Sequence, residues 1–297
     1  MKTSTLTIPK LFSEADWRFK PRPAGRDWLR AGARPPASLS ALPYPFRMNA
    51  VFAAALLLVA LGATQPGDNP TTPNTLTADE KRDGWKLLFD GRTTTGWRGA
   101  YKDAFPEHGW SVEKGTLTIQ QSDGSESQSF GDIVTSDEYA NFDLRFDFKL
   151  TEGANSGVKY YVVEEQPKPK GSAFGLEYQV LDDERHPDAK LGRDGNRTIG
   201  SLYDLIPAKD KRVSPMGEWN TGRVLSKNNH VEHWLNGQKV LEYERGSEAF
   251  RALVAQSKYK APEYNAHGRF GEAPKGHILL QDHGNRVSYR NIKIKAL

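Results

Sequence analysis

Apolar and polar residues alternate along several segments of the chain. In residues 142–150, Phe and Leu occupy every second position, with Asp, Arg and Lys between them, and residues 176–180 and 287–295 repeat this period. A period of two is typical of a β-strand that buries one face. The alternation slips by one residue between Tyr289 and Ile292, which predicts a β-bulge or a bend at that point.

Residues 231–243 predict a β-hairpin, because Asn236-Gly237 is the pair that a two-residue type I′ turn prefers. Residues 247–257 predict the one clear helix, with its apolar residues spaced for a single face. Further strands are expected near residues 85–89, 110–120, 132–136, 155–163, 200–204, 218–226 and 276–282. Many short strands with few short helices predict an all-β fold, a β-sandwich of the jelly-roll type.

A run of twelve apolar residues occupies positions 50–61. It is shorter than the roughly 20 residues that a transmembrane helix needs, and small residues follow it, as at a signal-peptide cleavage site. We therefore interpret residues 48–63 as a signal peptide and predict no stable membrane span. The Pro/Thr/Asn-rich residues that follow predict a linker over 64–84, ahead of a domain at 85–297.

Residues 1–47 are rich in Pro and Arg and show no sustained period. Met48 stands two residues before the start of the apolar run, so we interpret it as the initiator and residues 1–47 as absent from the mature protein. A genuine long basic leader is the alternative. Both interpretations predict an exported protein, periplasmic or extracellular.

The charge distribution argues against a nucleic-acid partner. Residues 1–47 carry an excess of +6, whereas the whole chain carries +4, which leaves −2 for the predicted mature domain. A domain that tracks phosphates is expected to be basic. The chain has no cysteine, which excludes disulfides, thiolate metal sites and a cysteine nucleophile.

Polar residues cluster at predicted strand ends. Glu177 and Gln179 share one face of a strand whose other face is apolar, and Asp182, Asp183 and His186 follow in a loop. Loops on a rigid scaffold commonly carry catalytic groups, so this cluster is the first candidate site. A solvated strand face with a polar turn is the alternative.

Two further segments carry candidate residues. His283 lies at a strand end, and histidine suits proton transfer near neutral pH; a polar hairpin loop is the alternative there. Asn155 opens the segment Asn-Ser-Gly, which by itself is typical of a structural turn. Phosphate-binding glycine loops, a serine nucleophile elbow and a paired-histidine zinc motif do not occur in the sequence.

Taken together, the segments from about residue 85 to 297 resemble the 3-keto-disaccharide hydrolase domain family. The matching segments are Leu87–Gly91 with Gly96-Trp97, Asn155–Gly157, Gly175–Gln179 with Asp182-Asp183 and His186-Pro187, Ser201–Asp204, Glu218–Asn220, Leu235–Gly237, and Gly276–Gly284 with Tyr289–Ile292. The resemblance implies a concanavalin A-like β-sandwich, an exported location and action on glycosides oxidised at C3.

On this resemblance we predict two groups of site residues. The expected catalytic residues are Glu177, His186, Asp182 and His283, and the expected substrate-binding residues are Gln179, Asn155, Asp183 and Tyr203. The ketone at C3 acidifies the C2 proton, so the implied reaction is C2 proton abstraction, β-elimination of the aglycone and hydration. A divalent cation held by Asp182 or Asp183 is a candidate cofactor for polarising the ketone.

Two alternatives to this reaction stay open at the level of sequence. A non-catalytic carbohydrate-binding module would use the same fold, because fold alone does not decide function. A conventional glycoside hydrolase would pair Glu177 with one of the two aspartates.

Overall fold

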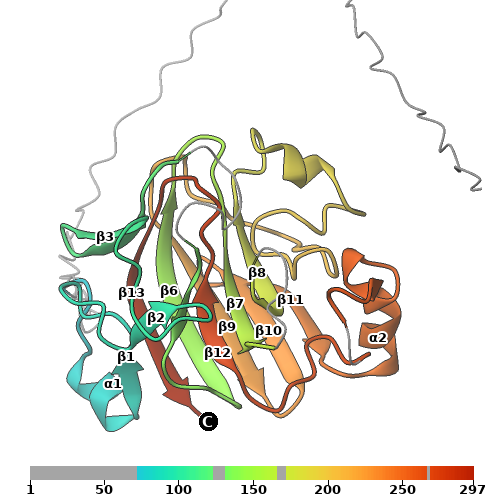
Figure 1. Ribbon diagram of the computed structural model, residues 1–297, viewed down its shortest axis with the longest axis horizontal. Coiled ribbons are helices and arrows are strands. Elements are labelled where there is room, and N and C mark those ends of the chain that lie inside the picture. The colour runs from blue at the N-terminus through green and yellow to red at the C-terminus, as the bar shows by residue number, and fades with distance from the viewer. Residues whose placement is uncertain (1–71, 123–130, 166–171, 266–267) are drawn as a thin grey trace, which may run out of the picture. The chain divides into compact units, whose positions relative to one another are not determined.

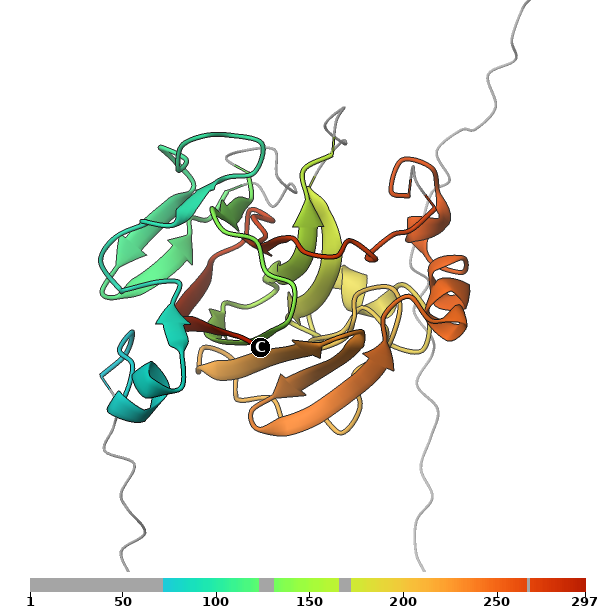
Figure 2. The same cartoon turned by 90° about the horizontal axis from the view of Figure 1, so that it is seen from below.

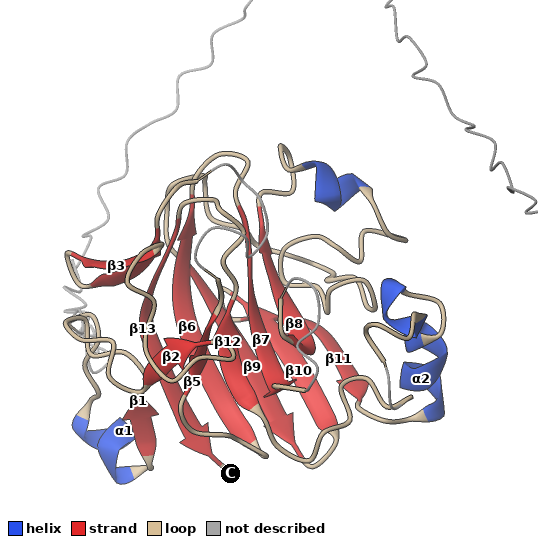
Figure 3. Ribbon diagram, in the orientation of Figure 1, coloured by secondary structure: helices blue, strands red, loops and turns tan. Residues whose placement is uncertain are grey.

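The computed structural model describes residues 72–122, 131–165, 172–265 and 268–297. The predicted leader, the signal peptide and the first part of the linker lie outside the described residues. The described residues form two antiparallel sheets with short helices at their margins (Figures 1 and 3), and Figure 2 shows the two layers from below. The predicted all-β sandwich with few short helices is therefore confirmed.

The larger sheet has eight strands and the smaller sheet has five. The larger contains, in spatial order, β11 (Gln238–Glu244), β10 (His230–Leu235), β9 (Asn220–Lys227), β6 (Phe142–Leu150), β13 (Val287–Ala296), β4 (Thr116–Ile119) and β3 (Trp110–Glu113), with β1 (Trp85–Leu87) also paired to β13. The smaller contains β2 (Trp97–Gly99), β5 (Ile133–Thr135), β12 (His277–Leu280), β7 (Asn155–Val163) and β8 (Phe174–Leu181).

The helices are short, and each is ordered by a local cap. They are α1 (Ala78–Arg82), the 3₁₀ turns η1 (Pro187–Lys190) and η2 (Lys258–Lys260), and α2 (Glu248–Val254). The hydroxyl of Ser247 accepts the Phe250 N–H at 3.1 Å, which starts α2 within the predicted range of 247–257. Within the described residues, no helix is long and apolar enough to span a membrane.

The two local backbone features that the pattern predicts are both present. Asn236 and Gly237 have φ of 49° and 77°, between the paired residues Leu235 and Gln238, as a type I′ hairpin requires. The β6–β13 register shifts between Arg290 and Lys293, where Asn291 has φ of 52°. The slip in the hydrophobic period was therefore a β-bulge.

The strand predicted at residues 200–204 was wrong. Gly200 and Asp204 both have positive φ, and Leu202 also forms an isolated bridge to Ile206, four residues further along the chain. This segment is a compact loop whose residue Leu202 meets β8 at a single bridge to Tyr178. Its apolar residues are buried by a tight chain reversal instead of by sheet pairing.

The C-terminal part of the expected linker is ordered against the sandwich. Residues 78–82 form α1, and Asn74 exchanges two hydrogen bonds with Asn291, of 2.6 Å and 2.8 Å. The positive φ of Asn291 at the bulge presents both its backbone and its side chain to Asn74. From residue 72 onward the segment is thus part of the folded unit.

The core lies between the two sheets. Phe146 of β6 meets Tyr178 of β8 edge to face, with ring centroids 5.3 Å apart. His233 is a buried polar residue there, and it contacts the Tyr160 hydroxyl at 2.7 Å and the Gly200 carbonyl at 3.0 Å. Burial lowers the pKa of His233 to about 4, so it is a neutral core residue with both nitrogens satisfied.

Candidate active site

The outer face of the smaller sheet carries the first group of candidates. Because Leu176, Tyr178 and Val180 point into the core, the alternate residues Glu177 and Gln179 lie on the other face of β8. In the neighbouring strand β7, Lys159 pairs in register with Glu177, and Gly157 pairs with Gln179. Glu177 and Lys159 are only 4% and 5% exposed, so this face is not a solvated one.

Gly157 makes room for the Glu177 carboxylate. A Cβ atom at position 157 would lie 2.2 Å from Glu177 Oε1, so only glycine leaves the space that this side chain occupies. With its amide nitrogen turned toward Glu177, Gln179 donates to Oε1 at 3.2 Å. The Asn-Ser-Gly segment therefore lies inside a strand and not in a turn, and its glycine serves a close approach.

Lys159 is a buried cation that is not among the residues predicted from the sequence. Its Nζ lies 3.8 Å from Glu177 Oε2, 2.5 Å from the Ser172 hydroxyl and 3.3 Å from the Ala173 carbonyl. Ser172 in turn hydrogen-bonds to Asp132. A signal was present in the sequence, because Lys159 and Asn155 have the same parity along one predicted strand and therefore share its face.

Tyr203 lies beside this group through a backbone contact. Its N–H donates to the Glu177 carbonyl at 3.0 Å, which holds the loop 199–205 along β8. Burial, and then the charges of Asp188 and Glu177, raise the pKa of Tyr203 far above its ordinary value. Tyr203 is therefore a protonated phenol, and its ring lies 4.4 Å from the Lys258 ammonium.

His186 and His283 come together from two different loops. Their ring centroids are 5.9 Å apart, and the rings are perpendicular. His186 Nδ1 accepts the Asp188 N–H at 3.2 Å, whereas the buried Nδ1 of His283 has no hydrogen-bond partner among the described residues. Burial, and then the nearby His283, lower the pKa of His186, so this imidazole is neutral at neutral pH.

Asp182 and Asp183 hold the loop that carries His186. Asp182 accepts backbone N–H groups of Gly153, Glu184 and Arg185 at 2.8 Å, 3.1 Å and 3.3 Å. Although burial acts in the opposite direction, these bonds and the Arg185 charge lower the pKa of Asp182.

Asp183 has its own partners in the protein. It accepts the Ile199 N–H at 2.7 Å and pairs with Lys211 Nζ at 2.6 Å. Since the protein itself already engages both aspartates, Asp182 and Asp183 do not fit a divalent-cation site.

The Asp182–Asp183 loop also lines a cavity of about 410 Å³, together with residues 213–218. The lining contains neither Glu177 nor either of the paired histidines. We therefore do not assign this cavity to the candidate active site.

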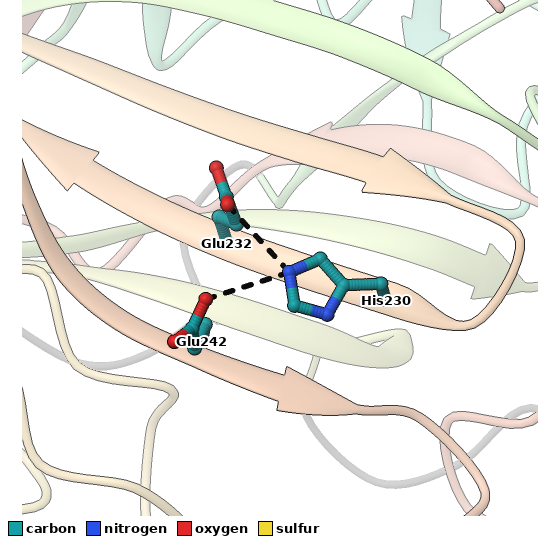
Figure 4. A group of neighbouring side chains, drawn as sticks. All are labelled: His230, Glu232 and Glu242. Atoms are coloured by element: carbon teal, nitrogen blue, oxygen red, sulfur yellow. Dashed lines mark ion pairs between the residues drawn. The ribbon is translucent and has the colours of Figure 1, made fainter.

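A metal-like group lies on the other sheet. Ligand atoms of His230, Glu232 and Glu242 lie within 4.8 Å of one another on β10 and β11 (Figure 4). Lys239 Nζ lies 2.6 Å from Glu242 and 3.4 Å from Glu232, so a cation of the chain already balances these carboxylates. This group is a charge network at the surface of the larger sheet.

The predicted residues thus separate into three sets. Asn155, Glu177 and Gln179 lie together on β7 and β8, with Lys159 added by the structure, and Tyr203 lies along the edge of β8. His186 and His283 form a contact pair, which is tied to the first set because Asn285 accepts the Asn155 N–H at 3.1 Å. Asp182 and Asp183 position the loop between them.

Comparison with known proteins identifies the family and the fold of this chain. The model of the family described as 3-keto-alpha-glucoside-1,2-lyase-like domain matches residues 84–295. A 3-keto-disaccharide hydrolase from Bacteroides thetaiotaomicron is 38% identical in an alignment of 232 residues, which covers 72% of this chain and 79% of that protein.

Two solved structures from Parabacteroides distasonis, both described as glycosyl hydrolases, share the fold. One has a TM-score of 0.65 at 35% identity and covers 76% of this chain and 100% of its own. The other has a TM-score of 0.53 at 30% identity, with coverage of 72% and 99%. The chain is therefore a glycoside hydrolase-like enzyme and belongs to the 3-keto-alpha-glucoside-1,2-lyase-like domain family.

Proposed function

We propose that this enzyme cleaves glycosides or disaccharides that carry a ketone at C3, by elimination followed by hydration. The observation that carries the proposal is the buried Glu177 carboxylate, which lies on the outer sheet face beside Gln179 and Tyr203. The similarity to a 3-keto-disaccharide hydrolase supports the substrate class. Glycosides and disaccharides are both carbohydrates, so the proposed substrate is a carbohydrate.

In the proposed reaction, Glu177 acts as the general base. It removes the C2 proton, and the C2–H electron pair forms the enolate of the C3 ketone. When the ketone re-forms, the double bond moves to C1–C2, and the bond from C1 to the aglycone oxygen breaks. The aglycone oxygen takes up a proton and leaves as an alcohol, and water then adds across the C1–C2 double bond.

The remaining residues have supporting roles in this proposal. Gln179 orients the Glu177 carboxylate by a hydrogen bond, and Asn155 and Tyr203 contact the sugar. The facing pair His186 and His283 exchanges the proton with the leaving oxygen and with water, because imidazole can both accept and donate near neutral pH. Asp182 and Asp183 hold the His186 loop in place.

Two measurements test this proposal. A 3-keto glycoside deuterated at C2 is expected to exchange that deuterium with solvent during turnover, and the unoxidised parent glycoside is expected to be inert. Glu177→Gln is expected to lower turnover by roughly a hundredfold, the scale of one acid–base group. The control Glu232→Gln changes a glutamate on the other sheet and should keep wild-type turnover.

Three outcomes would contradict the proposal in different ways. Full retention of deuterium at C2 would favour direct hydrolysis. Wild-type rates in a folded Glu177→Gln protein would remove Glu177 as the base. Sugar binding without turnover of any 3-keto glycoside would favour a carbohydrate-binding module.

A further inference from the structure

Lys159 is a buried charged group that has no role in the proposed elimination and hydration. An ammonium group has three N–H donors. Among the described residues, Lys159 Nζ has two hydrogen-bond acceptors, the Ser172 hydroxyl and the Ala173 carbonyl, at 2.5 Å and 3.3 Å. One donor of Lys159 is therefore not used by the described part of the chain.

The distance to Glu177 leaves this donor available. Lys159 Nζ and Glu177 Oε2 are 3.8 Å apart, which is beyond the range of a direct hydrogen bond. The pair is nevertheless buried on one sheet face, where a charge acts more strongly than it does in water. A cation and a carboxylate thus lie side by side without being joined by a short hydrogen bond.

Removal of a proton next to a ketone needs this combination of groups. The carbonyl oxygen gains negative charge as the proton on the adjacent carbon leaves, so a base and a positively charged donor must act on neighbouring atoms together. A separation of 3.8 Å lets Glu177 approach the C2–H bond while Lys159 reaches the oxygen on C3. A sugar with a hydroxyl at C3 develops no such charge and gains nothing from the ammonium.

Resting on the proposed function, we propose that Lys159 is a further catalytic residue, which donates a hydrogen bond to the C3 keto oxygen and stabilises the enolate. The proton passes from C2 to Glu177, and the negative charge passes to O3, next to the ammonium. No oxidant or reductant is needed, because the ketone is already present in the substrate. Lys159 thereby makes the site selective for oxidised sugars.

The first test is the exchange of the C2 proton with D₂O in a 3-keto sugar without an aglycone, followed by NMR. Lys159→Met is expected to slow this exchange by roughly 10²-fold, the effect of losing one charged donor to a developing oxyanion. KM for a 3-keto glycoside should change much less than kcat, because the interaction is strongest in the transition state. Lys159→Arg, which keeps the charge, should restore part of the rate.

The control is Lys293→Met, because Lys293 of β13 pairs with Glu80 of α1, away from the site. It loses a more exposed ion pair and should keep the wild-type exchange rate per folded molecule. Thermal unfolding of each variant separates loss of folding from loss of chemistry. This separation matters because removing one partner of a buried ion pair leaves the other charge uncompensated.

A second measurement works even if Lys159→Met does not fold. The infrared carbonyl stretch of a ¹³C-labelled 3-keto sugar should move to lower frequency when the sugar binds wild-type protein, and less so in Lys159→Arg. An unshifted stretch in wild-type protein, or wild-type exchange in folded Lys159→Met, would overturn the role of Lys159 while leaving the proposed function intact. Wild-type protein that neither exchanges nor cleaves any 3-keto sugar would overturn both.

Discussion

At the scale of single residues, burial and charge decide which candidates can do chemistry. Glu177, inside β8, and Asp182, directly after β8, are both buried acids, but their surroundings differ. Three backbone N–H groups surround the Asp182 carboxylate, as is typical of a residue that fixes a loop. Glu177 instead lies beside a lysine, a glutamine and a phenol, which suits it to interact with a sugar.

The histidine pair leads to a prediction about pH. Burial and the neighbouring His283 hold the pKa of His186 below its ordinary 6.5. The unfolded chain therefore binds more protons than the folded chain, and His186 makes the free energy of unfolding decrease as the pH falls through about 6.5. In His283→Gln, the pKa of His186 should move upward, because the lowering effect of His283 is removed while burial remains. NMR titration of the His186 ring measures this pKa, and an unchanged value would contradict the coupling of the two rings.

At the scale of elements, the site depends on how β7 and β8 pair. The register places Gly157 opposite Gln179 and Lys159 opposite Glu177. Gly157 therefore lies on the same sheet face as the charged and polar side chains around it. Either strand alone would show only an alternating pattern. The pairing turns this pattern into a site because Glu177 lies over Gly157.

Gly157→Ala tests this arrangement. The new Cβ would lie 2.2 Å from Glu177 Oε1, so the carboxylate must move, and turnover should fall at least tenfold in protein that still folds. We expect a cost in stability of about 1–3 kcal/mol from overpacking. Gly222→Ala is the matched control, because its Cβ would lie 2.4 Å from the buried Phe146 ring in the larger sheet. Denaturant unfolding should show a comparable loss for both variants, while only Gly157→Ala loses activity per folded molecule.

At the scale of the whole molecule, one folded unit accounts for the family match. The match begins at residue 84, and the packed segment before it reaches back to Asn74, which binds the bulge in β13. Segments far apart in sequence supply the candidate site: the consecutive strands β7 and β8 from the middle of the chain, and the His283 loop from near its end. The sandwich therefore has to be complete before the site exists.

The whole protein is predicted to be exported. Protein isolated from its native host is expected to lack residues 1 to about 63, because the apolar run at 50–61 has the length of a signal-peptide core. Leu57→Arg places a charge within that run and should leave the protein unprocessed in the cytoplasm, whereas Arg30→Ala should be processed normally. N-terminal sequencing of the mature protein makes the measurement, and an intact segment 1–47 would contradict the prediction.

The sequence by itself determined the features that arise from local periodicity and turn chemistry. Most strands of the sandwich, the Asn236-Gly237 turn and the bulge at Asn291 follow from alternation and from φ > 0 preferences, which are properties of neighbouring residues. Strand β2 was not expected from the sequence. The segment 200–204 was predicted as a strand from its apolar residues, but these residues are buried in a loop that folds onto β8. Local periodicity does not distinguish these two ways of burying apolar residues.

Only the tertiary structure decided which polar residues meet. Strand register placed Lys159 beside Glu177, and loop packing joined His186 to His283 across about a hundred residues of chain. The structure also shows that Asp182 binds backbone N–H groups and Arg185, and that Asp183 pairs with Lys211. Their positions in the sequence had instead predicted a direct role in the reaction. The physical reason is that hydrogen-bond partners and desolvation depend on distances between segments remote in sequence, and an alternating pattern of residues does not contain those distances.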